Sequence, residues 1–318
     1  MATMKAVRIH EYGGREALIL EEAPCPEPAK DEVLVRVAAT SVNPFDWAVR
    51  AGYLNGYYSY TFPLILGLDV SGVVEGVGSE VRSFSIGDSV YARSHPSKNG
   101  AYAEYIALPA SAVAMKPRSL DHIQSAAVPH AAFSAWDALI NVANLATGQT
   151  VLIHGAAGGV GTFAVQLAKS HGARVIGTGS AQNLDFLLGL GADEAIDYNV
   201  TRFEDVVHDV DVVLDLVGDM GDNTQQRSWK VLKPGGMLAS LVQPPSQEAA
   251  ATHHVQASFV SSDGCNGQVL AEIGALIDSG RLSPVVSTIL PLKDIRSAHE
   301  LSEGRHLRGK IVLTIDKN

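Results

Sequence analysis

The residues whose types and spacing point most directly to chemistry lie at 154–161, where the sequence reads HGAAGGVG. This glycine loop lies between an apolar run of strand length, 150–154, and a segment with apolar residues at helical spacing, 160–170. The free N–H groups of a first helical turn and the helix dipole favour a phosphate at such a junction. Gly158 would let phosphates approach the backbone, and Gly161 would let the helix pack closely on the strand. The segment therefore predicts a pyrophosphate-binding loop.

The order of the elements around this loop supports that interpretation. Glycines alone could mark only a tight turn, and Ala156 stands where the dinucleotide-binding fingerprint has its first glycine. However, apolar runs of strand length alternate with helical segments through this half of the chain. Such alternation predicts a parallel sheet covered on both faces, and six strands predict a doubly wound Rossmann domain. The six predicted strands are 150–154, 174–177, 195–198, 210–215, 237–242 and 257–260.

The end of the second predicted strand bears on the choice between NAD and NADP. Proteins that bind NAD usually carry an acidic residue there, about 20 residues past the loop, which contacts the ribose. Residues 177–183 read GTGSAQN, and Asp185 follows only within the next predicted helix. Because a carboxylate would repel a 2′-phosphate, its absence favours NADP. Ser180 could donate a hydrogen bond to that phosphate, cap the following helix, or do both, and the loop has no Lys or Arg.

Up to about residue 125 the sequence indicates short β-strands separated by turns. Residues 32–37 alternate between polar and apolar, and glycines punctuate 67–87 as they do in short, curved strands. Together these segments predict a small, partly open β-barrel. A predicted helix at 123–142 begins the second half of the chain. From about residue 282 strand character returns, so we expect this tail to rejoin the barrel.

Composition restricts the class of protein. A hydrophobic content of 46% with 18% charged residues is typical of a globular chain, and 318 residues suffice for two domains. No stretch approaches the ~20 apolar residues of a membrane helix, and no secretory signal is evident, so we expect a cytoplasmic protein that does not bind membranes. The net charge of −10 argues against a nucleic-acid partner. Cys25 and Cys265 cannot form a structural zinc site. A disulfide between them stays open, although a cytosolic chain would keep them reduced.

Seven motifs occur in an order and spacing that cover nearly the whole chain. They are SVNPFD (41–46), GLDVSGVV (67–74), GAYAEY (100–105), SAW (134–136), the glycine loop, DLVG (215–218) and RGKIVL (308–313). In these motifs the sequence resembles the zinc-free quinone oxidoreductase (zeta-crystallin-like) branch of the medium-chain dehydrogenase/reductase superfamily. The resemblance implies a GroES-like β-barrel domain formed by 1–125 with 282–318 and a Rossmann domain formed by 126–281. It also implies an active site in the cleft between them and a homodimer.

Two of the motifs depart from the zinc-dependent alcohol dehydrogenases of the same superfamily. Those enzymes carry a Cys where this chain has the turn 43–46 and Gly-His-Glu where it has Gly-Leu-Asp at 67–69, and their four-Cys loop is missing here. Without a thiolate or an imidazole at these positions we expect no catalytic zinc. A metal-free site does not easily polarise an alcohol for oxidation. The resemblance therefore implies NADPH-dependent hydride transfer to a quinone or an α,β-unsaturated carbonyl compound.

The resemblance also assigns residues to the parts of the cofactor. The basic residue that the family usually carries near the 2′-phosphate matches Asn183 here. Arg308 resembles a basic residue that reaches the cofactor phosphate, and Arg305 could serve instead. The remaining implied contacts are Ala157, Gly158, Gly159, Val160 and Gly161 for the pyrophosphate, Ser180 and Tyr198 for the 2′-phosphate and adenine, Ser134 for the nicotinamide end, and Val217 for its ribose or ring.

Two residues are candidates for chemistry at the substrate. The resemblance places Asn43 against the nicotinamide and the substrate, where its amide could donate to the oxygen that gains negative charge. As the first residue of Asn-Pro it could equally well form only a turn. Tyr53, with Tyr57, Tyr58 and Tyr60 nearby, could donate a hydrogen bond or stack on a flat ring, or could form only a lid that excludes water.

Three further residues in these motifs fit structural roles. Asp46 and Asp69 replace metal-region residues and are interpreted as turn or core-network residues, and His130 is interpreted as a structural histidine. Two other functions stay open. One is an enoyl-thioester reductase, which shares the zinc-free architecture, and the other is a nucleotide-binding protein with little catalysis. The glycine loop alone does not separate these functions.

Overall fold

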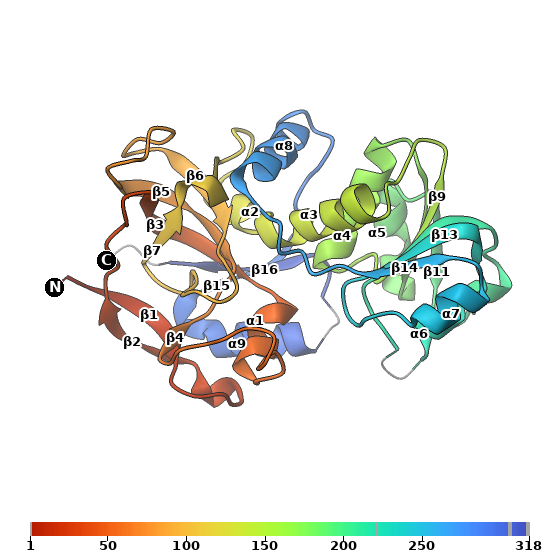
Figure 1. Ribbon diagram of the computed structural model, residues 1–318, viewed down its shortest axis with the longest axis horizontal. Coiled ribbons are helices and arrows are strands. Elements are labelled where there is room, and N and C mark those ends of the chain that lie inside the picture. Colours follow the sequence, from red (N-terminus) through yellow and green to blue (C-terminus); the bar gives the residue numbers. More distant parts are fainter. Residues whose placement is uncertain (1, 220–221, 305–306, 316–318) are drawn as a thin grey trace. The chain divides into compact units, whose positions relative to one another are not determined.

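The computed structural model describes residues 2–219, 222–304 and 307–315, which belong to two compact units. Unit 1 comprises Met1–His130, Cys265–Ser279 and Pro284–Asn318, and unit 2 comprises Ala131–Gly264 and Gly280–Ser283. Figure 1 shows the course of the chain through both units. Within the described ranges, no helix is both long enough and apolar enough to span a membrane.

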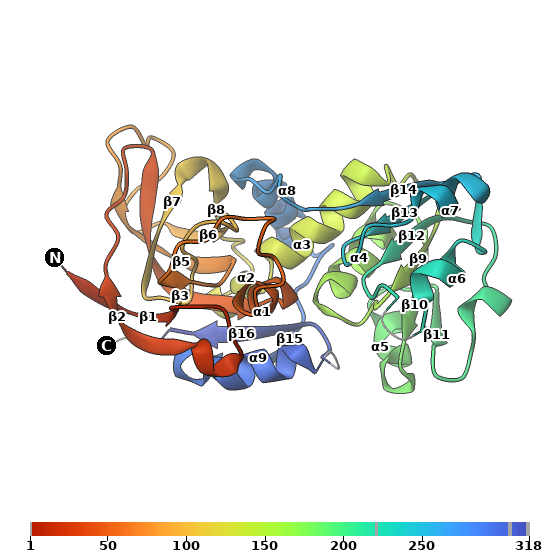
Figure 2. The ribbon, with the colours of Figure 1, turned by 60° about the horizontal axis from the view of Figure 1, so that its bottom comes forward.

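Unit 2 is built on a six-stranded parallel sheet. Its elements are β9 (Thr150–His154), α4 (Gly159–Ser170), β10 (Arg174–Gly179), α5 (Leu184–Gly189), β11 (Glu194–Asp197), β12 (Val210–Asp215), α6 (Thr224–Ser228), β13 (Leu232–Ser240), α7 (Gln247–Thr252) and β14 (Gln256–Phe259). The strand order is β11-β10-β9-β12-β13-β14. Every residue of β12 is buried, as expected for a strand covered on both faces. Figure 2 shows α4 on one side of the sheet and α6 and α7 on the other, so the predicted doubly wound fold is confirmed.

The carboxyl ends of the central strands meet at one edge of this sheet. His154 at the end of β9 pairs with Asp215 at the end of β12, and Gly179 at the end of β10 pairs with Asp197 of β11. The segments that follow these strands therefore leave from the same edge, which is where doubly wound sheets bind their ligands.

The predicted helix at 123–142 is wrong in its continuity. The chain forms α2 (His122–Ala126), breaks, and then forms α3 (Pro129–Trp136), which continues as a π-helical segment, Asp137–Val142. Proline has no N–H and disfavours helical geometry in the residue before it. One helix therefore ends ahead of Pro129, and a new helix begins there.

The described residues of unit 1 form two β-sheets, and their buried apolar side chains gather in three clusters. The smaller sheet has the order β2-β1-β4, and the larger has the order β15-β16-β3-β5-β6-β8 with β7 beside β3. Alternation along β3 places Val33, Val35 and Val37 in one core. The predicted GroES-like barrel fold is confirmed. The strands are β1 (Thr3–Ile9), β2 (Ile19–Pro24), β3 (Glu32–Val42), β4 (Leu64–Ile65), β5 (Asp69–Val77), β6 (Ser89–Arg93), β7 (Tyr105–Pro109), β8 (Val113–Met115), β15 (Val286–Pro291) and β16 (Lys310–Thr314).

Three further helices belong to unit 1: α1 (Pro44–Arg50), α8 (Gly267–Asp278) and α9 (Ile295–Glu303). The tail after residue 282, which we predicted only as strand, therefore also contains a helix. Residues 267–278 lie in the segment predicted for the nucleotide-binding domain, yet α8 clusters with unit 1. There the Tyr91 hydroxyl donates to the Leu270 carbonyl, and Ser119 N donates to Asp278 Oδ1 at 2.9 Å.

Candidate functional site

The glycine loop of unit 2 leaves no room for a side chain at Gly161. Gly155 adopts a positive φ of 71°, and Gly158 caps α4 in an extended conformation. A Cβ on Gly161 would lie 2.3 Å from the Gly155 carbonyl oxygen and 2.6 Å from that of Ala156. No real Cβ approaches backbone so closely, so the position requires glycine. A Cβ on Gly158 would meet only the Gly155 oxygen, at 3.3 Å.

Ala156, which replaces the first glycine of the fingerprint, has room because its neighbour has no side chain. The residue is fully buried, and a Cβ on Gly177 of β10 would lie 3.0 Å from the Ala156 methyl. The absence of a side chain at Gly177 makes space for the methyl group. The departure from the fingerprint is thus accommodated within the sheet rather than in the loop.

The first turn of α4 supplies backbone donors for an anion. The N–H groups of Gly159, Val160 and Gly161 belong to a turn that offers them no intrahelical acceptors. The 12-residue helix adds the positive end of its dipole. Ala157 is buried, whereas Gly158, Gly159 and Val160 are half-buried. A helix N-terminus with little side-chain bulk around it fits a pyrophosphate.

Ser180 and Tyr198 follow paired strand ends and therefore lie close together. Tyr198 N donates to the Gly179 oxygen at 3.2 Å, and Tyr198 is 50% exposed. Ser180 occupies the N-cap position of a short 3-10 turn, but its side chain makes no capping hydrogen bond. Instead, Asn183 Nδ2 donates to Ser180 Oγ at 3.1 Å. The structure thus brings together the polar residues that the sequence assigned to the 2′-phosphate and adenine.

Val217 lies against the glycine loop. A Cβ on Gly155 would lie 3.0 Å from Val217 Cγ1. The turn that carries Val217 is fixed by Asp215, a fully buried carboxylate at the end of β12. Asp215 accepts hydrogen bonds from Val217 N at 3.0 Å, Gly218 N at 2.8 Å and Gln225 Nε2 at 3.0 Å.

Ser134 is fully buried in α3, and its hydroxyl has no hydrogen-bond partner among the described residues. A buried hydroxyl without a partner costs about 1–3 kcal/mol, a cost that a bound polar group would offset. Arg308 is exposed and belongs to unit 1. Arg305, the alternative to it, lies outside the described residues.

Asn43 lies in a buried polar cluster of unit 1, at the turn between β3 and α1. The residue is 2% exposed, and its Nδ2 donates to Asp69 Oδ2 at 2.8 Å. Its Oδ1 accepts a hydrogen bond from Lys310 Nζ, which also lies 3.3 Å from Asp69 Oδ2. Both ends of the Asn43 amide are therefore held by charged groups. Asn43 is the N-cap residue of α1, and its N–H donates to Asp46 Oδ2 at 2.8 Å, as in the turn-forming alternative.

Asp69 is the centre of this cluster. Its carboxylate accepts hydrogen bonds from Ser41 Oγ, from Asn43 Nδ2 and, at 2.7 Å, from His130 N. Burial acts to raise the pKa of Asp69, but the Lys310 ammonium and these donors outweigh it and hold the pKa below its usual value. Asp69 is thus a buried anion, as a core-network residue should be.

A second buried chain of hydrogen bonds starts at Asp46. Its Oδ2 accepts from Asn43 N at 2.8 Å and from the Tyr102 hydroxyl at 3.0 Å. Tyr102 OH lies 3.3 Å from His299 Nε2, and His299 Nδ1 lies 3.0 Å from Arg50. Burial raises the pKa of Asp46 to about 7. Burial, together with the Arg50 charge, lowers the pKa of His299 to about 3.

The tyrosines after α1 divide into two groups. Tyr53 and Tyr57 are 71% and 80% exposed, and the Tyr53 ring packs edge-on against Trp47 at 6.5 Å. Tyr58 and Tyr60 are half-buried with ring centroids 6.2 Å apart. Tyr53 and Tyr57 are therefore accessible to solvent, whereas Tyr58 and Tyr60 belong to the packed side of the loop.

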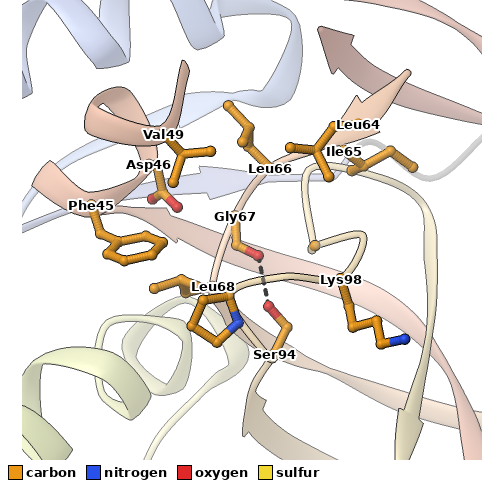
Figure 3. Close-up of a pocket in the computed structure, with 12 residues that line it drawn as sticks. Phe45, Asp46, Val49, Leu64, Ile65, Leu66, Gly67, Leu68, Ser94 and Lys98 are labelled. Atoms are coloured by element: carbon orange, nitrogen blue, oxygen red, sulfur yellow. Dashed lines mark hydrogen bonds between the residues drawn. The ribbon is translucent and has the colours of Figure 1, made fainter. Parts of the chain in front are cut away.

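A small cavity lies beside α1 in unit 1. Figure 3 shows its lining, with Phe45 and Asp46 from α1 and Ser94 donating to the Gly67 carbonyl at 3.1 Å. The cavity volume is about 10 Å³, room for roughly one water molecule. A quinone ring does not fit into this space, so we do not assign it to the substrate.

The sequence did not reveal most members of the polar clusters. Ser41, Tyr102 and Lys310 lie in three of the seven motifs, but no role was assigned to them from the sequence. Arg50 and His299 lie outside the motifs. A further signal was the lysine at the start of the apolar strand KIVLT, because a buried charge needs a partner. Among the residues the structure describes, no group of three or more His, Cys, Asp or Glu is placed to hold a metal ion.

Comparisons with known proteins agree with this geometry. Residues 29–118 match the family described as alcohol dehydrogenase GroES-like domain, and residues 190–313 match the family described as zinc-binding dehydrogenase. The chain is 36% identical to NADPH-dependent alkenal/one oxidoreductase of Arabidopsis thaliana, over 98% of this chain and 79% of that protein. It is 32% identical to quinone oxidoreductase of Sus scrofa, over 98% of each chain.

A solved structure shares the fold throughout. The quinone oxidoreductase from Coxiella burnetii superposes with a TM-score of 0.89 at 35% identity, covering 99% of this chain and 100% of that one. Identity at this level over nearly complete chains confirms the relationship indicated by the seven motifs. The protein is an oxidoreductase that belongs to the quinone oxidoreductase branch of the medium-chain dehydrogenase/reductase superfamily.

Proposed function

We propose that this protein is an NADPH-dependent, zinc-independent reductase of quinones or α,β-unsaturated carbonyl compounds. The observation that carries the proposal is the glycine loop with the first turn of α4, where position 161 has no room for a side chain. The names of the relatives, an alkenal/one oxidoreductase and a quinone oxidoreductase, support the acceptor class.

The residues of unit 2 fit the parts of NADPH. We assign the pyrophosphate to residues 157–161, the 2′-phosphate and adenine to Ser180 and Tyr198, and the nicotinamide end to Val217 and Ser134, whose orphaned hydroxyl would gain a partner there. Arg308 is assigned to a cofactor phosphate. NADPH supplies a hydride when bound.

Unit 1 would bind and orient the acceptor. Negative charge develops on the acceptor oxygen during reduction, and a positioned hydrogen-bond donor stabilises it. We assign this role to the amide of Asn43, which Asp69 and Lys310 hold in one orientation. Tyr53, which is exposed on the same unit, would contact the acceptor ring or donate a hydrogen bond to it.

We further propose that the substrate domain predicted as 1–125 with 282–318 corresponds to unit 1, and the dinucleotide-binding domain predicted as 126–281 to unit 2, except that α8 belongs to unit 1. A cytoplasmic homodimer is part of the same proposal. The backbone of β14, the edge strand of the parallel sheet, could pair with a second copy.

The first test is NADPH oxidation, followed by absorbance, with a chelator present and no added metal. The acceptors are 1,4-benzoquinone, 9,10-phenanthrenequinone and a short alkenal, each repeated with NADH. We expect chelator-resistant turnover that favours NADPH. Tight NADPH binding without turnover of any acceptor would contradict the proposal. A preference for enoyl thioesters would show that thioesters, rather than quinones or simple enones, are the acceptors.

A further inference from the structure

Arg93 is a buried cation without an anion. It is the last residue of β6 and is 5% exposed. Its single hydrogen bond runs from Nε to His130 Nδ1, at 3.1 Å. Within the described chain, none of the carboxylates forms a salt bridge with Arg93 and no other acceptor meets its terminal nitrogens. Those nitrogens are nevertheless not sealed inside the protein.

The nearest carboxylate in the sheet is already committed to other donors. Asp69 is the direct cross-strand partner of Arg93, so both side chains leave the same face of the β5–β6 pair. Asp69 accepts from Ser41, Asn43 and His130 N and forms a salt bridge with Lys310. The sheet therefore places Arg93 beside the Asn43 cluster without giving it a counter-ion.

His130 does not neutralise Arg93 either. Burial, together with the Arg93 charge, lowers the pKa of His130 to about 3, so the imidazole is neutral at neutral pH. Its Nδ1 accepts from Arg93 Nε, which leaves the ring proton on Nε2. Arginine side chains are not deprotonated in proteins, and a buried charge without a partner is costly. This cost is offset when an anion binds to the terminal nitrogens.

We propose that Arg93 determines specificity by binding the carboxylate of an acceptor that carries one in addition to its reducible group. The inference rests on the proposed function, because it places the anion next to Asn43. A guanidinium offers two parallel N–H donors, which match the two oxygens of a carboxylate. The acceptor class is thus a quinone or unsaturated carbonyl compound with a carboxylate substituent.

The test compares trans-4-oxo-4-phenylbut-2-enoate with its methyl ester, which presents the same unsaturated ketone without the charge. We expect wild type to prefer the acid in kcat/KM. Arg93→Met should lower kcat/KM for the acid on the order of tenfold to a hundredfold, mainly through KM, and leave the ester within about threefold. Arg93→Lys should lose part of the preference. Arg82→Met, which removes the same charge from an exposed position of unit 1, should leave kcat/KM unchanged for both the acid and the ester.

An equilibrium measurement separates this inference from the proposed function. Calorimetry with saturated 4-oxo-4-phenylbutanoate and its methyl ester reports binding without turnover, and circular dichroism checks that each variant folds. Tighter binding of the acid by wild type, abolished in Arg93→Met, would support the role of Arg93 even if no acceptor is reduced. Equal binding of acid and ester by wild type would overturn it. An equal decrease in kcat for the acid and the ester in Arg93→Met would also overturn it, because Arg93 would then act on the ketone that both compounds share.

Discussion

Lys310 Nζ donates a hydrogen bond to the side-chain oxygen of Asn43 and thereby joins β16 to the turn that begins α1. The same ammonium lies 3.3 Å from Asp69, and both charged groups are buried. The orientation of the proposed substrate-facing amide therefore depends on a buried ion pair. The geometry of unit 1 makes this dependence testable.

Replacing Lys310 with Met should lower the free energy of unfolding by about 3–5 kcal/mol, because Asp69 would remain as a buried charge without its cation. Urea unfolding measures the change. The double variant Lys310→Met/Asp69→Asn should recover a large part of the loss, because neither charge is then buried alone. If the double variant is as unstable as the single one, the ion pair is not the cause.

Replacing Gly161 with Ala should abolish NADPH binding and lower stability, because the added methyl would lie 2.3 Å from the Gly155 carbonyl. The matched control is Gly158→Ala, whose methyl would meet only one oxygen at 3.3 Å. We expect this control to fold normally but to bind NADPH about tenfold more weakly, because the methyl limits the approach of the phosphates. Fluorescence titration and thermal unfolding give the two readouts, and equal behaviour of the variants would refute the packing argument.

Replacing Asn183 with Arg should strengthen NADPH binding about tenfold and leave NADH binding unchanged, because a guanidinium pairs with the 2′-phosphate. Ser180→Ala should weaken NADPH binding a few-fold, again without effect on NADH. Competitive titrations with the two nucleotides measure both effects. A parallel change for NADH would place these residues away from the 2′-phosphate.

Replacing Asp46 with Asn should remove a pH dependence of stability. The pKa of Asp46 rises from 3.8 to about 7 on folding, so the folded protein holds the proton more tightly than the unfolded chain. The stability that this proton contributes is fully present below about pH 4 and is lost as the pH rises through about 7. Asp46→Asn should lack this loss, which is on the order of a few kcal/mol. Urea unfolding of both proteins at pH 5 and pH 8 tests it, and a difference that does not vary with pH would count against the shift.

Replacing Tyr53 with Phe should lower kcat/KM for quinones about tenfold if its hydroxyl contacts the acceptor. Tyr57→Phe is the control, because Tyr57 is also largely exposed in the same loop. Steady-state kinetics with one quinone suffice. Equal effects of the two substitutions, or no effect of either, would indicate that this loop only excludes water from the site.

The nucleotide-binding half was largely predictable because its signals are local. Strand β12 has the predicted limits, and the requirement for glycine at position 161 follows from one strand–turn–helix junction. The clusters of unit 1 could not be predicted because their members meet through tertiary packing. In α9 the buried positions 295, 298, 299 and 302 have helical spacing, but two of them are His299 and Ser302. Their polar side chains hid the helix within a tail of strand character.

The return of the chain to unit 1 also has a consequence for its biosynthesis. Strand β16 pairs with residues 39–42 of β3 and carries the cation of Asp69, yet the ribosome makes it after all of unit 2. While the parallel sheet of unit 2 is being completed, β3 therefore lacks its β16 neighbour and Asp69 lacks its counter-ion. Chains that stall before residue 310 expose this unfinished sheet, which makes them natural clients for chaperones or proteolysis.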